Sequence, residues 1–118
     1  MSGISDLTMR TVEFALDGLS ARDDVRANNV ANVNTPGYQA RTVDFEGVLR
    51  DALARGIDPA GLEVPGAVPA PGVPDATGNT VSLEDELVGQ IEDGLLNQAL
   101  IHGYNFKIDV LRTAIGGR

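Results

Sequence analysis

The stretch ANNVANVNTPGYQA, residues 27–40, marks the place where a helix ends and the chain turns away from it. Thr35 precedes a proline and is therefore disfavoured in the α region of backbone conformations. Pro36 and Gly37 suit the two central positions of a type II turn, in which the glycine supplies a positive φ angle. The stretch therefore predicts a helix C-terminus followed by a tight corner.

The asparagines of this stretch need hydrogen-bond partners. Asparagine is a mediocre helix former because its side-chain amide competes for backbone groups. In one interpretation the amides are solvated at a helix end, which composition alone slightly favours. In the other, Asn28, Asn29 and Asn32 bond backbone groups across a subunit boundary, with Tyr38 packing beside them.

The segment before the turn, residues 1–35, is predicted to be a long helix. Apolar residues recur at helical spacing through Leu7, Phe14 and Val25, and a neighbouring apolar line widens the stripe. Such a stripe is wider than a two-stranded seam needs, so we expect it to be buried against more than one neighbour. Gly18 interrupts the pattern. It either allows another helix to approach closely or is tolerated at a cost of about 1 kcal/mol relative to alanine.

The middle segment, residues 36–80, divides into a short helix and a long irregular loop. Asp44 is a good N-cap for a helix over about residues 45–55, and Gly56 suits the position just after its C-terminus. Residues 56–80 hold five of the six prolines and five glycines. This composition excludes helix and nearly excludes regular strand. We expect an extended, polyproline-like loop or a segment that is disordered in isolation.

The last segment, residues 81–118, is predicted to be a second long helix that begins with a capping box at Ser82 and Asp85. Alternating steps of four and three residues give a seam in which seven of ten members are apolar: Leu83, Leu87, Gln90, Gly94, Asn97, Ile101, Tyr104, Ile108, Leu111 and Ile115. This spacing is typical of a coiled coil. The predicted fold class is therefore all-α, with the two long helices packed as a coiled-coil-like pair that resembles a filament subunit more than a globule.

The composition argues against several classes of function. A net charge of −8 over 118 residues disfavours binding to nucleic acid or to an anionic membrane. His102 is the single histidine, cysteine is absent, and no catalytic, metal or phosphate-binding motif occurs. We therefore expect no enzymatic activity, no cofactor, no metal and no small-molecule substrate. The start of the sequence predicts no cleavable signal peptide, and no apolar run is long enough to span a membrane.

The opening stretch also carries a resemblance to a known family. Asn29-Val30-Ala31-Asn32, two residues, and then Thr35-Pro36-Gly37-Tyr38 resemble the N-terminal signature of bacterial flagellar axial proteins, in which N-I-A-N precedes T-P-G-Y at the same gap. Residues 40–45, 78–86 and 111–117 are similar to segments of the flagellar basal-body rod proteins. The sequence departs from the usual pattern in Val30, where isoleucine is common, and in Gln39, where a basic residue is common.

This resemblance implies a structural subunit of the flagellar rod, the drive shaft that crosses the periplasm and transmits torque to the hook and filament. We expect no room for an additional domain, which favours the two short proximal-rod subunits, and the ending LRTAIGGR favours the B-type over the C-type. The implied partners are other copies of itself, the C-, F- and G-type rod proteins, hook-basal body protein E and the inner-membrane ring. Export by the flagellar type III apparatus is implied to occur without a cleaved signal.

Three alternatives stay open at this point. They are the C-type sibling, a soluble helical adaptor or export chaperone, and a small enzyme. The rod interpretation changes the preferred explanation of the asparagines, because a chain with few aromatic residues cannot easily complete its own core. We therefore expect the signature residues to be held for a neighbouring subunit, and the seam to include Leu7, Phe14 and Val25 of the first helix.

Overall fold

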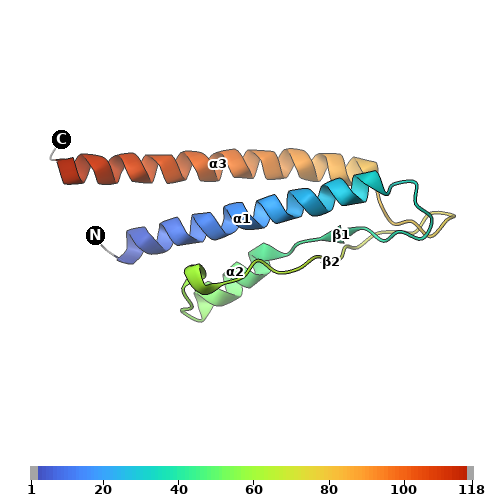
Figure 1. Ribbon diagram of the computed structural model, residues 1–118, viewed down its shortest axis with the longest axis horizontal. Coiled ribbons are helices and arrows are strands. Elements are labelled where there is room, and N and C mark those ends of the chain that lie inside the picture. Colours follow the sequence, from blue (N-terminus) through green and yellow to red (C-terminus); the bar gives the residue numbers. More distant parts are fainter. Residues whose placement is uncertain (1–2, 117–118) are drawn as a thin grey trace.

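The computed structural model describes residues 3–116, with side chains from Leu7 onward, so residues 1–2 and 117–118 of the predicted terminal segments lie outside the described part. Helices α1 (Gly3–Ala31) and α3 (Leu83–Gly116) run antiparallel along the length of the molecule. The middle segment, with α2 (Phe45–Ala54), lies on the other side of α1 from α3 (Figure 1). The predicted all-α class with two long helices packed together is confirmed.

The molecule is long and flat. Its principal extents are 64 × 28 × 15 Å and its radius of gyration is 17.8 Å, whereas a compact domain of this length has a radius of gyration of about 13 Å. Helix α1 forms the middle layer, because it contacts α3 as well as α2 and the small elements of the middle segment. The wide apolar stripe predicted for α1 therefore packs against more than one element of its own chain.

Local hydrogen bonds set the ends of α2 and α3 as the sequence predicts. The Asp44 carboxylate accepts from the backbone N–H of Gly47 at 2.9 Å, and Ser82 Oγ accepts from the N–H of Asp85 at 3.2 Å. After α2, Gly56 adopts a φ of +74°, and the N–H of Ile57 donates to the carbonyl of Ala52 at 2.8 Å. The bond from Ile57 to Ala52 and the left-handed Gly56 are features of a Schellman motif, which ends a helix.

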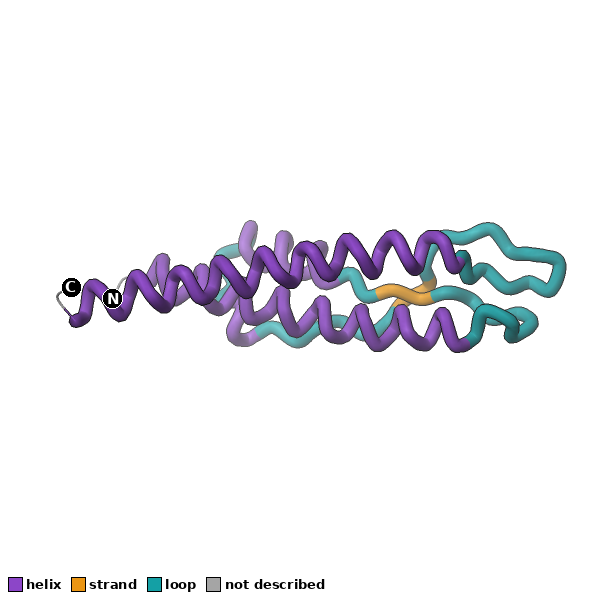
Figure 2. Tube along the Cα trace, turned by 90° about the horizontal axis from the view of Figure 1, so that it is seen from above, coloured by secondary structure: helices purple, strands orange, loops and turns teal. Residues whose placement is uncertain are grey.

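The predicted type II turn after α1 is also present. Gly37 has a φ of +74°, and the N–H of Tyr38 donates to the carbonyl of Thr35 at 3.2 Å. The loop that precedes α3 lies at the same end of the molecule, opposite both termini (Figure 2). The N–H of Gly37 donates to the carbonyl of Thr77 at 2.9 Å, so the two loops are joined directly.

The proline- and glycine-rich loop contains short elements that the sequence did not predict. A 3-10 turn, η1 (Pro59–Gly61), begins where Asp58 accepts from the N–H of Ala60. Strand β2 (Val68–Pro69) then pairs antiparallel with β1 (Arg41–Thr42). Proline stands at the start of the 3-10 turn and at the end of a two-residue edge strand, where its missing N–H is tolerated.

The apolar core lies where the middle segment meets α1. Its fully buried members are Phe14, Ala15, Leu19, Val43 and Phe45. The Phe45 ring packs directly on Gly18, so closely that a β-carbon at this glycine would overlap the ring. This contact decides between the two explanations of Gly18: it allows a helix, α2, to approach closely.

We predict that Gly18→Ala destabilises the protein although alanine is the better helix former. The added methyl group would displace the Phe45 ring, with an expected loss of about 1–3 kcal/mol in the free energy of unfolding. Gly103→Ala on α3 is the matched control, because a β-carbon there meets no atom within 4 Å. The free energy of unfolding of this control variant should rise by up to about 1 kcal/mol. Urea unfolding followed by circular dichroism measures both, and equal gains in the two variants would contradict the packing argument.

Candidate functional site

Among the side chains that the structure describes, the most buried polar one is Asn29, near the end of α1, which is 1% exposed. Its Nδ2 donates to the carbonyl of Arg41 at 2.8 Å and to Glu86 Oε2 at 3.0 Å. Its Oδ1 accepts from the N–H of Arg41 at 3.0 Å and from the Tyr38 hydroxyl at 3.5 Å. One amide therefore joins α1, the segment that returns from the turn, and α3.

The prediction that Asn29 bonds a neighbouring subunit is wrong, since its donors and its acceptor are satisfied within the chain. The corner at residues 35–38 carries the chain back over α1 and places the backbone of Arg41 against this amide. Asn32 is also bonded locally: its Nδ2 donates to the carbonyl of Asn28 at 2.8 Å, and its Oδ1 accepts from Thr35 Oγ1 at 3.0 Å. Asn28 is exposed, and its proposed role at a subunit boundary stays a prediction.

A second buried asparagine, Asn79, closes the C-terminal end of α1 from the other loop. It is 2% exposed, and its Nδ2 donates to the carbonyls of Asn32 and Thr35 at 2.9 and 2.7 Å. Both carbonyls belong to the turn that follows α1, so this side chain ties the turn to the loop that precedes α3. Its Oδ1 accepts from the N–H of Val81 at 2.7 Å, just before α3 begins. Sequence reasoning did not assign a role to this residue.

Charged side chains fill the middle of the contact between α1 and α3. Arg22 binds Asp93 through two hydrogen bonds of 2.8 and 3.1 Å and also donates to Glu46 at 2.8 Å. The guanidinium of Arg22 lies over the Phe45 ring, 4.7 Å from its centroid, which adds a cation–π contact. This arginine therefore connects α3 to α2 across α1.

Arg26 repeats the arrangement one turn further along α1. It donates to Glu86 at 3.1 Å and to Asp93 at 2.8 Å. Glu86 in turn accepts from Asn29, so the ion pairs continue into the asparagine site. We call these residues the polar cluster, and its members are Arg22, Arg26, Asn29, Glu46, Glu86 and Asp93.

The ion pairs of the polar cluster shift two pKa values. Burial is the largest influence on Arg22 and lowers its pKa, but the hydrogen bonds and charges of Glu46 and Asp93 together outweigh burial, so the pKa is raised. Burial is also the largest influence on Asp93 and raises its pKa. The bonds and charges of Arg22 and Arg26 outweigh that effect, so this pKa is lowered. Both charged forms are therefore favoured in the folded protein.

Sequence reasoning missed the polar cluster because it searched for an apolar seam. The signal was the spacing: Arg22, Arg26 and Asn29 are four and three residues apart, and Glu86 and Asp93 are seven apart, so each set shares a helix face. The carboxylates of the cluster are held by arginines, an arrangement suited to fastening helices together. Within residues 3–116, no group of histidine, aspartate or glutamate side chains could hold a metal ion, and no helix is long and apolar enough to cross a membrane.

The predicted seam residues are distributed over different surroundings. Phe14 is buried, and the partly buried members are Val25, Tyr104, Ile108 and Leu111. The Tyr104 hydroxyl donates to Glu13 at 3.1 Å, which brings this part of the seam against α1. The members exposed in the single chain are Leu7, Leu83, Leu87, Ile101 and Ile115.

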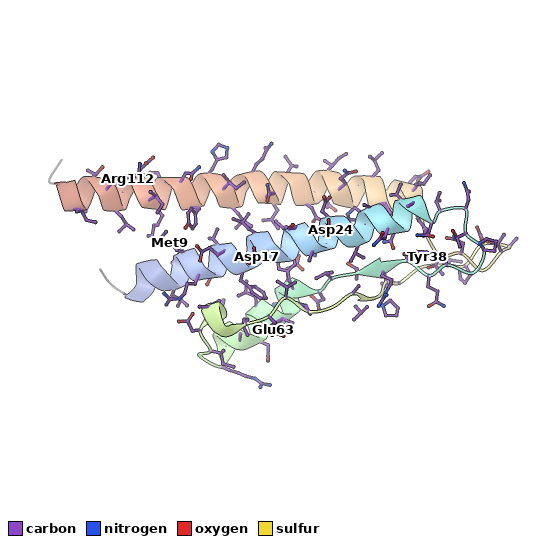
Figure 3. The ribbon with its side chains drawn as sticks, viewed as in Figure 1. Met9, Asp17, Asp24, Tyr38, Glu63 and Arg112 are labelled. Carbon is purple, nitrogen blue, oxygen red and sulfur yellow. The ribbon has the colours of Figure 1, made fainter. Side chains whose placement is uncertain are left out.

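The signature residues do not form one contiguous site. Asn29 is buried, and Asn32 and Tyr38 are partly buried beside the turn. Tyr38 lies on the returning segment at the turn end of the molecule (Figure 3). The remaining signature residues are exposed: Val30, Ala31, Thr35, Pro36 and Gly37. The signature therefore combines an internal hydrogen-bonding site with an exposed apolar surface on the last turn of α1.

We predict that Asn29→Ala lowers the free energy of unfolding by about 2–4 kcal/mol, because it leaves the backbone N–H and carbonyl of Arg41 and one oxygen of the buried Glu86 without their partner. Asn28→Ala is the matched control on the exposed side of the same helix and should change stability by no more than about 0.5 kcal/mol. Chemical denaturation of both variants measures the difference. Equal effects at the two positions would contradict the role assigned to the buried amide.

The lowered pKa of Asp93 predicts that the fold is sensitive to acid. Since Asp93 ionises more readily in the folded state, its contribution to stability is complete above the unfolded pKa of about 3.9 and is lost as the pH falls through the lower folded pKa. Asp93→Asn should therefore cost about 1–3 kcal/mol at pH 7. The deficit should shrink as the pH falls below about 4. Urea unfolding over a pH series tests this, and a deficit that stays constant at acid pH would contradict it.

Comparison with known proteins supports the resemblance of the signature residues to flagellar rod proteins. Residues 9–39 match the family model described as flagella basal body rod protein. The flagellar basal body rod protein FlgB of Cereibacter sphaeroides is 33% identical over 107 residues, which cover 81% of this chain and 84% of that protein.

Two further relatives carry the same name. FlgB of Salmonella typhimurium is 33% identical over 100 residues, which cover 69% of this chain and 72% of that protein. The match to FlgB of Escherichia coli is 43% identical over 53 residues, but it spans 45% of this chain and only 38% of the length of that relative. The two matches at 33% identity each cover more than two thirds of both proteins, and the chain therefore belongs to the FlgB family of flagellar basal body rod proteins.

Proposed function

We propose that this chain is a structural subunit of the proximal flagellar rod, required for assembly of the flagellum and for motility. Membership of the FlgB family supports this proposal and favours it over a helical adaptor, an export chaperone or an enzyme. The proposed partners are other copies of the chain, the C-, F- and G-type rod proteins, hook-basal body protein E and the inner-membrane ring. Export from the cytoplasm by the flagellar type III apparatus, without a cleaved signal, is part of the same proposal.

The observation that carries the proposal is the uncovered apolar face of α3. Among the described helices and strands, α3 contacts only α1. On its opposite side Leu87, Val88, Ile91 and Leu95 are each more than half exposed, and Leu95 reaches 64%. An apolar helix face is stable when it is buried against a neighbour. Large exposed apolar patches of this kind mark sites of protein association.

The exposed members of the predicted seam support the same conclusion. Leu83, Leu87 and Ile101 lie along α3 at helical spacing and are not covered by α1. In an assembled tube, neighbouring subunits would bury these side chains and replace the water that now contacts them. We therefore propose that the first half of the α3 seam contacts neighbouring subunits. Over this half of α3, charged residues make the contact with α1 inside the chain.

We predict that Leu95→Asp abolishes assembly without unfolding the chain. The side chain is 64% exposed, so the free energy of unfolding should change by no more than about 0.5 kcal/mol. A strain that lacks the gene should be non-motile and have no rods in electron micrographs of basal bodies. The unaltered gene and the conservative variant Leu95→Met should restore swimming, whereas Leu95→Asp should not. Normal swimming of the deletion strain would refute the rod function, and full rescue by Leu95→Asp would refute the role of this face.

A further inference from the structure

An open groove runs between α1 and α3, and only residues of these two helices line it. It consists of two adjoining hollows of about 500 and 380 Å³, which share Asp23 of α1 and Gln90 of α3 as lining residues. The polar cluster closes its floor, since Asp93 lines one hollow and Arg26 the other. The groove is separate from the apolar core, which lies between α1 and the middle segment.

Small side chains keep the groove open, and its apolar lining comes from α1, whereas α3 contributes Gln90, Asp93 and Asn97. Ala27, Val30 and Ala31 line it from α1, and Val30 is 43% exposed. On α3, Gly94 lines it, and a β-carbon there would meet no atom within 4 Å. These dimensions and this chemistry suit the apolar face of another helix.

The α1 side of the groove is acidic, and its acids are not neutralised within the chain. Asp17, Asp23 and Asp24 are exposed, and none of them pairs with a basic side chain among the described residues. Figure 3 shows Asp17 and Asp24 along α1, seven residues apart and hence on one helix face. The nearest arginines of α1, Arg22 and Arg26, are bound by the carboxylates of the polar cluster. Helix α1 therefore gives the groove both its apolar lining and an unpaired negative edge.

We propose that this groove binds an amphipathic helix of a different protein, with its apolar face against Val30 and Gly94 and with lysines or arginines facing Asp17, Asp23 and Asp24. Charge complementarity identifies this partner. A second copy of the chain fits poorly, because its own apolar face on α3 is flanked by Glu84 and Glu92 and would bring acids against acids in a chain of net charge −8. This inference rests on the proposed rod function in one respect. The bound helix would belong to a different protein that neighbours this chain in the rod.

Two synthetic helical peptides test the proposal directly on the purified chain. Each has about 18 residues, roughly 27 Å of helix, and the same leucine and alanine face. One peptide has lysines along one edge and the other has glutamates. Fluorescence anisotropy should show that the lysine peptide binds at least about tenfold more tightly at low salt, with an advantage that declines as salt rises.

Two pairs of matched variants locate the binding site. Gly94→Leu should fill the groove and weaken binding of the lysine peptide at least about tenfold, whereas Gly103→Leu adds the same side chain at another open position of α3 and should not. Asp17→Lys with Asp24→Lys should weaken binding to a similar extent. Glu63→Lys with Asp109→Lys makes the same change of charge at exposed positions outside the groove, and it should leave most of the affinity.

Three results would overturn the proposal. Equal affinity for the two peptides would remove the argument from charge, and undiminished binding to Gly94→Leu would place the contact elsewhere. A dimer of the unaltered chain that Gly94→Leu disrupts, detected by analytical ultracentrifugation, would identify a second copy as the occupant. Because binding is measured on the isolated chain, its failure is distinguishable from failure of the rod function, which the motility of the deletion strain reports.

Discussion

The buried amide of Asn29 is the contact on which the arrangement of the chain depends. It bonds the backbone N–H and carbonyl of Arg41 and one oxygen of Glu86. Its bonds form only when α1, the segment after the turn and α3 are packed together. A buried polar group without partners costs about 1–3 kcal/mol, which makes partial arrangements unfavourable. The returning segment, the two short strands and the start of α3 therefore take positions relative to this one side chain.

The charged contact between α1 and α3 explains how a chain with so small an apolar core aligns two long helices. Arg22 and Arg26 reach Asp93 from successive turns of α1, and Glu86 joins the same set of bonds. A shift of one helix by a turn would separate these pairs and leave charges partly buried without partners, which is strongly unfavourable. The charged residues thus determine the register of the helices, and the apolar residues on the opposite face of α3 stay exposed in the single chain.

The proline-rich loop has a structural role within the subunit. It lies along α1, on the side opposite α3, and its short strand pairs with the segment after the turn (Figure 1). The Arg41 side chain donates to the carbonyl of Ala67 at 2.8 Å, and the N–H of Ala70 donates to the carbonyl of Ala40 at 2.9 Å. The loop therefore returns the chain to the turn end of the molecule, where α3 begins beside the end of α1.

The sequence by itself determined the features that depend on local physics and on a specific signature: the two long helices, the caps at Asp44, Gly56 and Ser82, the turn at Pro36-Gly37, and the resemblance to rod proteins. Only the tertiary structure decided the partner of Asn29, because an amide can bond any backbone group that the fold brings near, and that group lies beyond the turn. It also decided which face of α3 meets α1. The helical spacing of apolar residues favours a seam through Leu83 and Leu87, but the opposite charges at Arg22, Arg26, Glu86 and Asp93 are satisfied only when a different face turns inward.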